Sequence, residues 1–161
     1  MKKSALVTIG ALVALAAVNT ASAQSATQTV TFQVTAINQI AVTGTPSLVI
    51  NSAAAGSAPT AVTSSGNTWS VTTNQTGASI TASIPTAMPT GVTLSANLTA
   101  PSGATSTGLT ALGTTAVNVV TGISKLNASG LALAYQLDAT AAAGVVTSAT
   151  RVVTFTITGG V

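Results

Sequence analysis

Side chains that can do chemistry are scarce in this 161-residue sequence. It contains no His, no Cys and a single acidic residue, Asp138, beside four basic residues. General acid–base catalysis usually needs a His, or two carboxyl groups with separated pKa values, and one Asp supplies neither. A lone carboxylate would hold Ca²⁺ only weakly, and Zn²⁺ sites built on His or Cys are excluded. We therefore expect no enzymatic activity, no cofactor, no metal and no small-molecule substrate.

A Ser/Lys pair is the one nucleophilic arrangement left to consider. Ser124 directly precedes Lys125, but adjacent residues of a strand point to opposite faces, so we expect the two side chains to diverge. Trp69 and Tyr135 could serve as ligand platforms. Both fall at inward positions of alternating segments, which favours a place in the core.

Residues 1–23 have the three parts of a secretory signal peptide. Two Lys follow the initial Met, an apolar run spans residues 5–18, and the small residues Ala21 and Ala23 precede Gln24. The apolar run is shorter than the roughly 20 residues that span a bilayer. We expect a signal peptide at 1–23, contact with a membrane during export alone, and a final location outside the cell, at its surface or in the periplasm.

Removal of the leader changes the charge of the protein. The remaining domain, residues 24–161, keeps two cations, Lys125 and Arg151, and one anion, Asp138, a side-chain balance of +1. Two isolated cations cannot neutralise a run of phosphates, which excludes nucleic acid as a partner. We interpret the three charges as solubilising groups near strand ends, where they discourage edge pairing.

Alternation of apolar and polar residues with period two dominates residues 24–161 and predicts an all-β domain. The pattern indicates a single β-sandwich of about seven to nine antiparallel strands with Greek-key or jelly-roll (Ig-like) connections. The turn at 74–77 is expected to close a hairpin. The expected strands lie within residues 29–37, 48–50, 68–74, 78–84, 92–100, 114–123, 131–139 and 151–158. The expected core is Phe32, Trp69, Ile80, Leu94, Val117, Leu133, Tyr135, Leu137, Phe155 and Ile157.

The near-absence of charge favours a protein that assembles. Soluble domains usually carry about a quarter or more charged residues on their surface, whereas charged residues make up 3% of this chain. A surface of Thr, Ser, Ala and backbone has little colloidal protection against association. This composition indicates a structural subunit of an extracellular fibre or coat, with a second copy or another surface protein as its partner.

Three segments carry a resemblance to known proteins: the alternating stretch at 29–37, the inward Leu/Tyr strand at 131–139, and the closing sequence RVVTFTIT. Together they resemble small secreted bacterial β-sandwich proteins of the fimbrial and spore-coat-U-like kind. The resemblance implies donor-strand assembly, in which the N-terminal strand of one subunit completes the sheet of its neighbour. The donor residues would be Thr29, Val30, Thr31, Phe32, Gln33, Val34, Thr35, Ala36 and Ile37.

Two alternative hypotheses of function stay open. Outward Thr and Ser pairs could form an array that binds ice or another surface, as in a secreted monomeric binding module, and carbohydrate is a further ligand class for such a module. Alternating strands behind a signal peptide also fit a small outer-membrane barrel, although the aromatic content of 2% is low for the interfacial girdles. The outward pairs are Thr29/Thr31, Thr81/Ser83, Thr93/Ser95, Thr154/Thr156 and Thr156/Thr158.

The signal-peptide hypothesis predicts cleavage between Ala23 and Gln24, because small residues at 21 and 23 follow the apolar run. The exported protein should begin Gln24-Ser25-Ala26, which intact-mass analysis measures directly. An exported protein that retains Met1 would contradict the export hypothesis.

Overall fold

The structure is a computed structural model that describes residues 22–161. Most of the expected signal peptide, including Ala21, lies outside the described residues. The chain divides after Gln33, and the two parts are described separately. Residues 22–33 contain no helix or strand. Within residues 22–161, no helix has the length and apolar character of a membrane span.

Residues 34–161 form an all-β fold, as the alternation predicted. Besides its strands, the described chain contains one short 3₁₀ helix, η1 (Ala141–Ala143). The strands are β1 (Asn38–Thr43), β2 (Val62–Thr63), β3 (Asn67–Thr73), β4 (Ala78–Ser83), β5 (Val92–Leu98), β6 (Thr105–Ser106), β7 (Thr110–Ala111), β8 (Val117–Ile123), β9 (Leu126–Ala139) and β10 (Thr154–Thr158).

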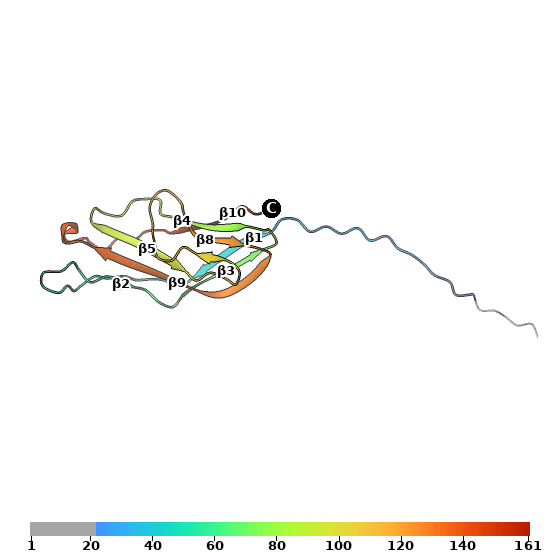
Figure 1. The fold of residues 1–161 in the computed structure, drawn as a ribbon, viewed down its shortest axis with the longest axis horizontal. Coiled ribbons are helices and arrows are strands. Elements are labelled where there is room, and N and C mark those ends of the chain that lie inside the picture. The colour runs from blue at the N-terminus through green and yellow to red at the C-terminus, as the bar shows by residue number, and fades with distance from the viewer. Residues whose placement is uncertain (1–21) are drawn as a thin grey trace, which may run out of the picture. The chain divides into compact units, whose positions relative to one another are not determined.

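The strands form two antiparallel sheets (Figure 1). The larger sheet has the order β1-β3-β9-β5-β7, with β2 also paired to β9, and the smaller has the order β10-β4-β8-β6. On one side the edge strands β1 and β10 are six and five residues long, whereas the opposite edges, β7 and β6, have two residues each. Long unpaired edges are therefore confined to the side of β1 and β10.

Alternating side chains from both sheets fill one core, as in a β-sandwich. Strand β3 buries every second residue, including Trp69 and Val71, while β4 buries Ala78, Ile80 and Ala82 from the other sheet. The fully buried Trp69 also places its indole Nε1 3.1 Å from the Thr99 carbonyl oxygen, so its polar atom is satisfied. The remaining buried apolar residues are Ile84, Leu94, Ala96, Leu98, Leu112, Val119, Val120, Ile123, Leu133 and Tyr135.

The turn at residues 74–77 does not close the expected hairpin. Its flanking strands, β3 and β4, belong to different sheets, so the turn is an arch between the layers. The Ser124-Lys125 connection between β8 and β9 is a second arch beside it, and the Lys125 amide donates to the Gln75 carbonyl at 2.9 Å. Two consecutive strands that face each other across the core belong to different sheets. An arch connects such strands, whereas a hairpin connects neighbours within one sheet. We call this end of the fold, with both arches, the arch end.

Three predicted strand segments are not strands in the described part of the chain, because they find no partner strand among residues 22–161. Residues 29–37 precede the first strand, which begins at Asn38, and residues 48–50 are likewise outside any strand. At the C-terminal side, β10 begins at Thr154, so residues 151–153 of the expected last strand are unpaired. Alternation reports a side-chain pattern suited to a strand, but a sheet also requires a neighbouring main chain.

The predicted core residues at the centre of the sandwich are buried, whereas those at its margins are partly buried or exposed. Five of the ten expected residues are buried: Trp69, Ile80, Leu94, Leu133 and Tyr135. Phe32 is wrong, since its side chain is 89% exposed. The other four pack against the core but are only partly buried, because they lie near edges or where the second sheet does not reach: Val117, Leu137, Phe155 and Ile157.

Truncation of Ile80 should test this core. Its side chain is fully buried between the sheets, so Ile80→Ala should destabilise the fold by about 2–5 kcal/mol through lost burial and a residual cavity. Val145→Ala removes a β-branched side chain that is 99% exposed and should change stability by less than about 0.5 kcal/mol. Denaturant unfolding of both variants measures the difference, and equal effects would show that β4 is in the wrong register.

Candidate functional site

The N-terminal segment Thr29–Ile37 exposes apolar side chains at regular spacing. Val30, Phe32 and Val34 are 72%, 89% and 79% exposed, and the residues between them are polar. In an extended chain, residues two apart project to the same side. The segment therefore has a strand's amphipathic pattern while belonging to no sheet among the described residues.

Asn74 fixes the point at which this segment joins the sheets. Its Oδ1 accepts from the Ile37 amide at 2.8 Å, and its Nδ2 donates to the Thr35 carbonyl at 2.7 Å. Gln75 supports the same side chain by donating its Nε2 to Asn74 Oδ1 at 2.7 Å. Because Asn74 belongs to an arch, the segment enters the fold at the arch end.

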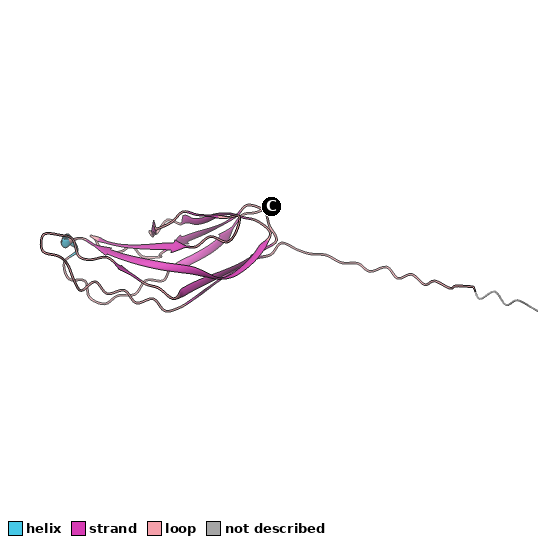
Figure 2. Cartoon of the chain, turned by 60° about the horizontal axis from the view of Figure 1, so that its bottom comes forward, coloured by secondary structure: helices cyan, strands magenta, loops and turns pink. Residues whose placement is uncertain are grey.

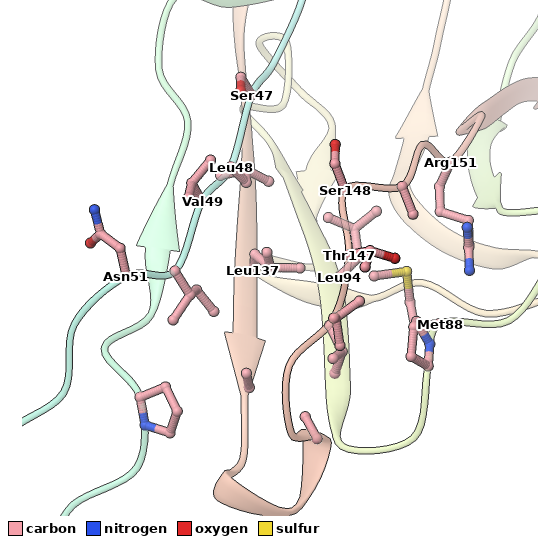
Figure 3. A pocket seen from close by; sticks show the side chains of 18 of the residues that line it. Ser47, Leu48, Val49, Asn51, Met88, Leu94, Leu137, Thr147, Ser148 and Arg151 are labelled. Atoms are coloured by element: carbon pink, nitrogen blue, oxygen red, sulfur yellow. The ribbon is translucent and has the colours of Figure 1, made fainter.

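A groove of about 980 Å³ lies toward the other end of β9. Its floor includes Leu94 of β5 and Leu137 of β9, with Tyr135 contributing from β9. Two irregular segments flank the floor, residues 46–53 and residues 144–153 (Figure 3). The strands of the smaller sheet lie mainly toward the arch end, and loops take their place over this part of the larger sheet (Figure 2). We call this end the loop end.

The two flanking segments, which we call the rails, resemble strands without partners. In the first rail, Leu48 and Ile50 are half-buried and Val49 between them is exposed. The second rail directly precedes β10. In it, the half-buried Arg151 and Val153 alternate with the exposed Val152. In the described chain, residues 45–51 and 145–153 make no main-chain to main-chain hydrogen bond. These two stretches therefore offer unpaired main-chain donors and acceptors, apart from the Thr150 carbonyl, which accepts from Arg151.

Arg151 brings the single positive charge at the groove. Its Nη1 donates to the Thr150 carbonyl at 2.9 Å and its Nη2 to the Ala87 carbonyl at 3.1 Å. Its Nε is buried and lacks a hydrogen-bond partner among the described residues. A buried guanidinium N–H without an acceptor is energetically costly.

The other residues considered for chemistry lie elsewhere and serve the fold. Ser124 and Lys125 occupy an arch and not a strand, and Ser124 Oγ accepts from the Gly77 amide at 3.0 Å. Asp138 Oδ2 accepts from Gln136 Nε2 at 3.0 Å on β9. Trp69 is in the core. Residues 22–161 hold no cluster of three His, Cys, Asp or Glu side chains.

Sequence reasoning found the exposed segment but missed the groove. The signals were present at residues 48–50 and 151–153, which alternate like strands. Nothing in a single sequence shows that such segments lie side by side without pairing, because that depends on the packing of both sheets.

Comparison of the chain with protein-family models, with curated proteins and with solved structures gives no match.

Tyr135 contributes to the groove floor and is the one Tyr in the chain. Ionisation of its phenol can therefore be followed by absorbance. Burial raises the pKa of its phenol above the ordinary value of 10.0. The folded state thus disfavours the phenolate, so this contribution to stability is complete below about pH 10 and is lost as pH rises through the raised pKa. Phenolate absorbance should show a midpoint above 10 in the folded protein and near 10 in denaturant.

The matched variant for this titration is Tyr135→Phe, which keeps the ring and removes the ionisable group. Its stability should fall less steeply above about pH 10 than that of the wild type. Equal slopes, or a folded midpoint at or below 10, would contradict burial of this phenol.

Proposed function

We propose that this protein is a non-catalytic, exported structural subunit of an extracellular fibre or coat, in which subunits join by β-strand contacts through Thr29–Ile37. The observation that carries the proposal is the exposure of Val30, Phe32 and Val34 on a segment with strand alternation and no strand partner among residues 22–161. A second copy is the preferred partner, and another surface protein is the alternative.

Energetics support an interaction role for this segment. Burial of a Val or Phe side chain contributes about 1.5–3 kcal/mol relative to full exposure. Three such side chains together are comparable with the lower range of association costs, about 4–15 kcal/mol. Main-chain hydrogen bonds along an added strand would supply the remaining affinity, and the alternating apolar side chains would set the register.

Charge supports the same proposal. The described residues carry three charged side chains, Lys125, Asp138 and Arg151, and none lies within Thr29–Ile37. Charged residues, especially Lys, are the usual defence of a sheet edge against pairing with another chain. The long edges β1 and β10 contain none.

The proposal includes features drawn from the sequence. They are a cleaved leader at residues 1–23, a mature domain at 24–161 with Greek-key or jelly-roll connections, and likeness to the fimbrial and spore-coat-U-like proteins. An absence of enzymatic activity follows from the residue inventory.

One observation favours a second candidate, a surface-binding module. Across β10 and β4, Thr154 pairs with Ser83, Thr156 with Thr81, and Thr158 with Ser79, which gives an outward array of hydroxyl groups. The pair Thr93/Ser95 does not extend it, because Ser95 is buried. Inhibition of ice growth by the wild type, lost in Thr156→Val, would favour this candidate over assembly.

The assembly role predicts that Phe32→Asp abolishes polymer formation, because the carboxylate lacks the apolar contacts of the ring and must lose its hydration on entering an apolar contact surface. The mature wild-type protein should form filaments or high-mass species at high concentration, measured by light scattering and negative-stain microscopy. The melting temperature of the variant monomer should be unchanged, since Phe32 is exposed.

Gln33→Asp is the matched control, because it adds the same charge to the opposite side of the same segment. It should weaken polymer formation far less than Phe32→Asp. A wild type that stays monomeric at high concentration, or equal effects of the two variants, would count against strand contact through this face.

A further inference from the structure

We propose that the groove between the two rails receives the segment Thr29–Ile37 of a second copy of this chain, so that subunits join head to tail. This inference rests on the proposed function and identifies the acceptor surface, which the sequence did not reveal. Three observations carry it: the reach of the segment, the placement of the free edges, and the largely unpaired main chain of the rails.

Chain length excludes the protein's own segment from its own groove. Ile37 is held by Asn74 at the arch end, where Thr73 of β3 pairs with Leu126 at the start of β9. Tyr135, at the near end of the groove, lies nine residues further along β9, roughly 30 Å along a strand. Phe32 is five residues from Ile37 and can reach at most about 18 Å. Val30, seven residues from Ile37, can reach at most about 25 Å. The segment therefore cannot cover the groove floor at Tyr135 in its own subunit and can do so only in another.

The free edges of the sheets lead into the groove. The first rail follows β1 in the chain and the second precedes β10, so both continue the two long edge strands. The opposite edges end in the two-residue strands β6 and β7, which offer little main chain for pairing. An added strand is thus favoured on the side of β1 and β10, toward the loop end.

The rails supply what an added strand needs. Most of their main-chain groups are unpaired in the described chain, apart from those of Ser52, Gly144 and the Thr150 carbonyl. An extended segment between the rails could bond to either one with its peptide groups while its alternate side chains face Leu94 and Leu137. Figure 3 shows these two Leu side chains at the floor, with Leu48 and Val49 on one side and Arg151 near Met88 on the other.

This arrangement has a direction. The donor enters the fold at the arch end, and the acceptor groove lies toward the loop end, so the contact uses two different surfaces of each subunit. Such a heterologous contact, when its rotation does not close a ring, continues as an open filament.

Disulfide trapping in the full mature chain tests the acceptor directly, because the natural sequence has no Cys. Val30→Cys marks the donor and Val146→Cys marks the groove lining, and both are nearly volume-conserving. Under mild oxidation the mixed single variants should form a Val30→Cys/Val146→Cys heterodimer at least tenfold faster than Val30→Cys forms one with Leu109→Cys, an exposed control beside β7. Cross-linking requires the Cα atoms to approach within about 7 Å.

The double variant Val30→Cys/Val146→Cys should give a ladder of covalent oligomers, and a closed monomer would overturn the assignment to a second copy. If the wild type polymerises and Phe32→Asp prevents it, but Leu109→Cys traps the donor as well as Val146→Cys does, the acceptor groove is wrong and the proposed function stands. If the wild type does not polymerise, the proposed function itself fails.

Discussion

Burial of alternating side chains between two sheets is the interaction on which the rest of this structure depends. With no disulfide possible and almost no charge, stability must come from apolar packing and from the hydrogen bonds that satisfy the polar groups buried with it. Trp69, Ile80 and Val119 meet in this core from both sheets. The arches at residues 74–77 and 124–125 are consequences of the same requirement, because they carry the chain from one layer to the other.

The smaller sheet does not cover the whole of the larger one, and this difference creates the groove. Strand β9 has fourteen residues, whereas the strands of the smaller sheet have at most seven. Leu94 and Leu137 therefore lie on a floor bordered by irregular segments instead of a facing sheet. Polar main chain near an apolar surface is unfavourable without partners, and the groove places these two features together.

The sequence predicted the all-β class and most of the strands because their alternation is strict, as in the closing Thr-Phe-Thr-Ile-Thr of β10. It misplaced residues 29–37 and 48–50 for a physical reason: alternation describes side chains, whereas a strand also needs a main-chain partner. The arch at 74–77 was mistaken for a hairpin because turn residues do not reveal which sheet the next strand joins. Val119 and Val120 are both buried, where the pairing of β8 with β4 shifts register, and simple alternation does not predict this either.

The segments whose pairing was mispredicted share a feature that bears on function. Each misplaced segment has strand character that the isolated chain does not use: the exposed N-terminal segment and the two rails. Two of them border one groove, and the third enters the fold at the opposite end, too far away to fill its own groove. Natural sequences tend to agree locally with the structure they form, and disagreements concentrate at functional sites. The strand pattern of these segments, unpaired in the described chain, supports the proposal that they pair between subunits, where all three would gain the main-chain partners they lack.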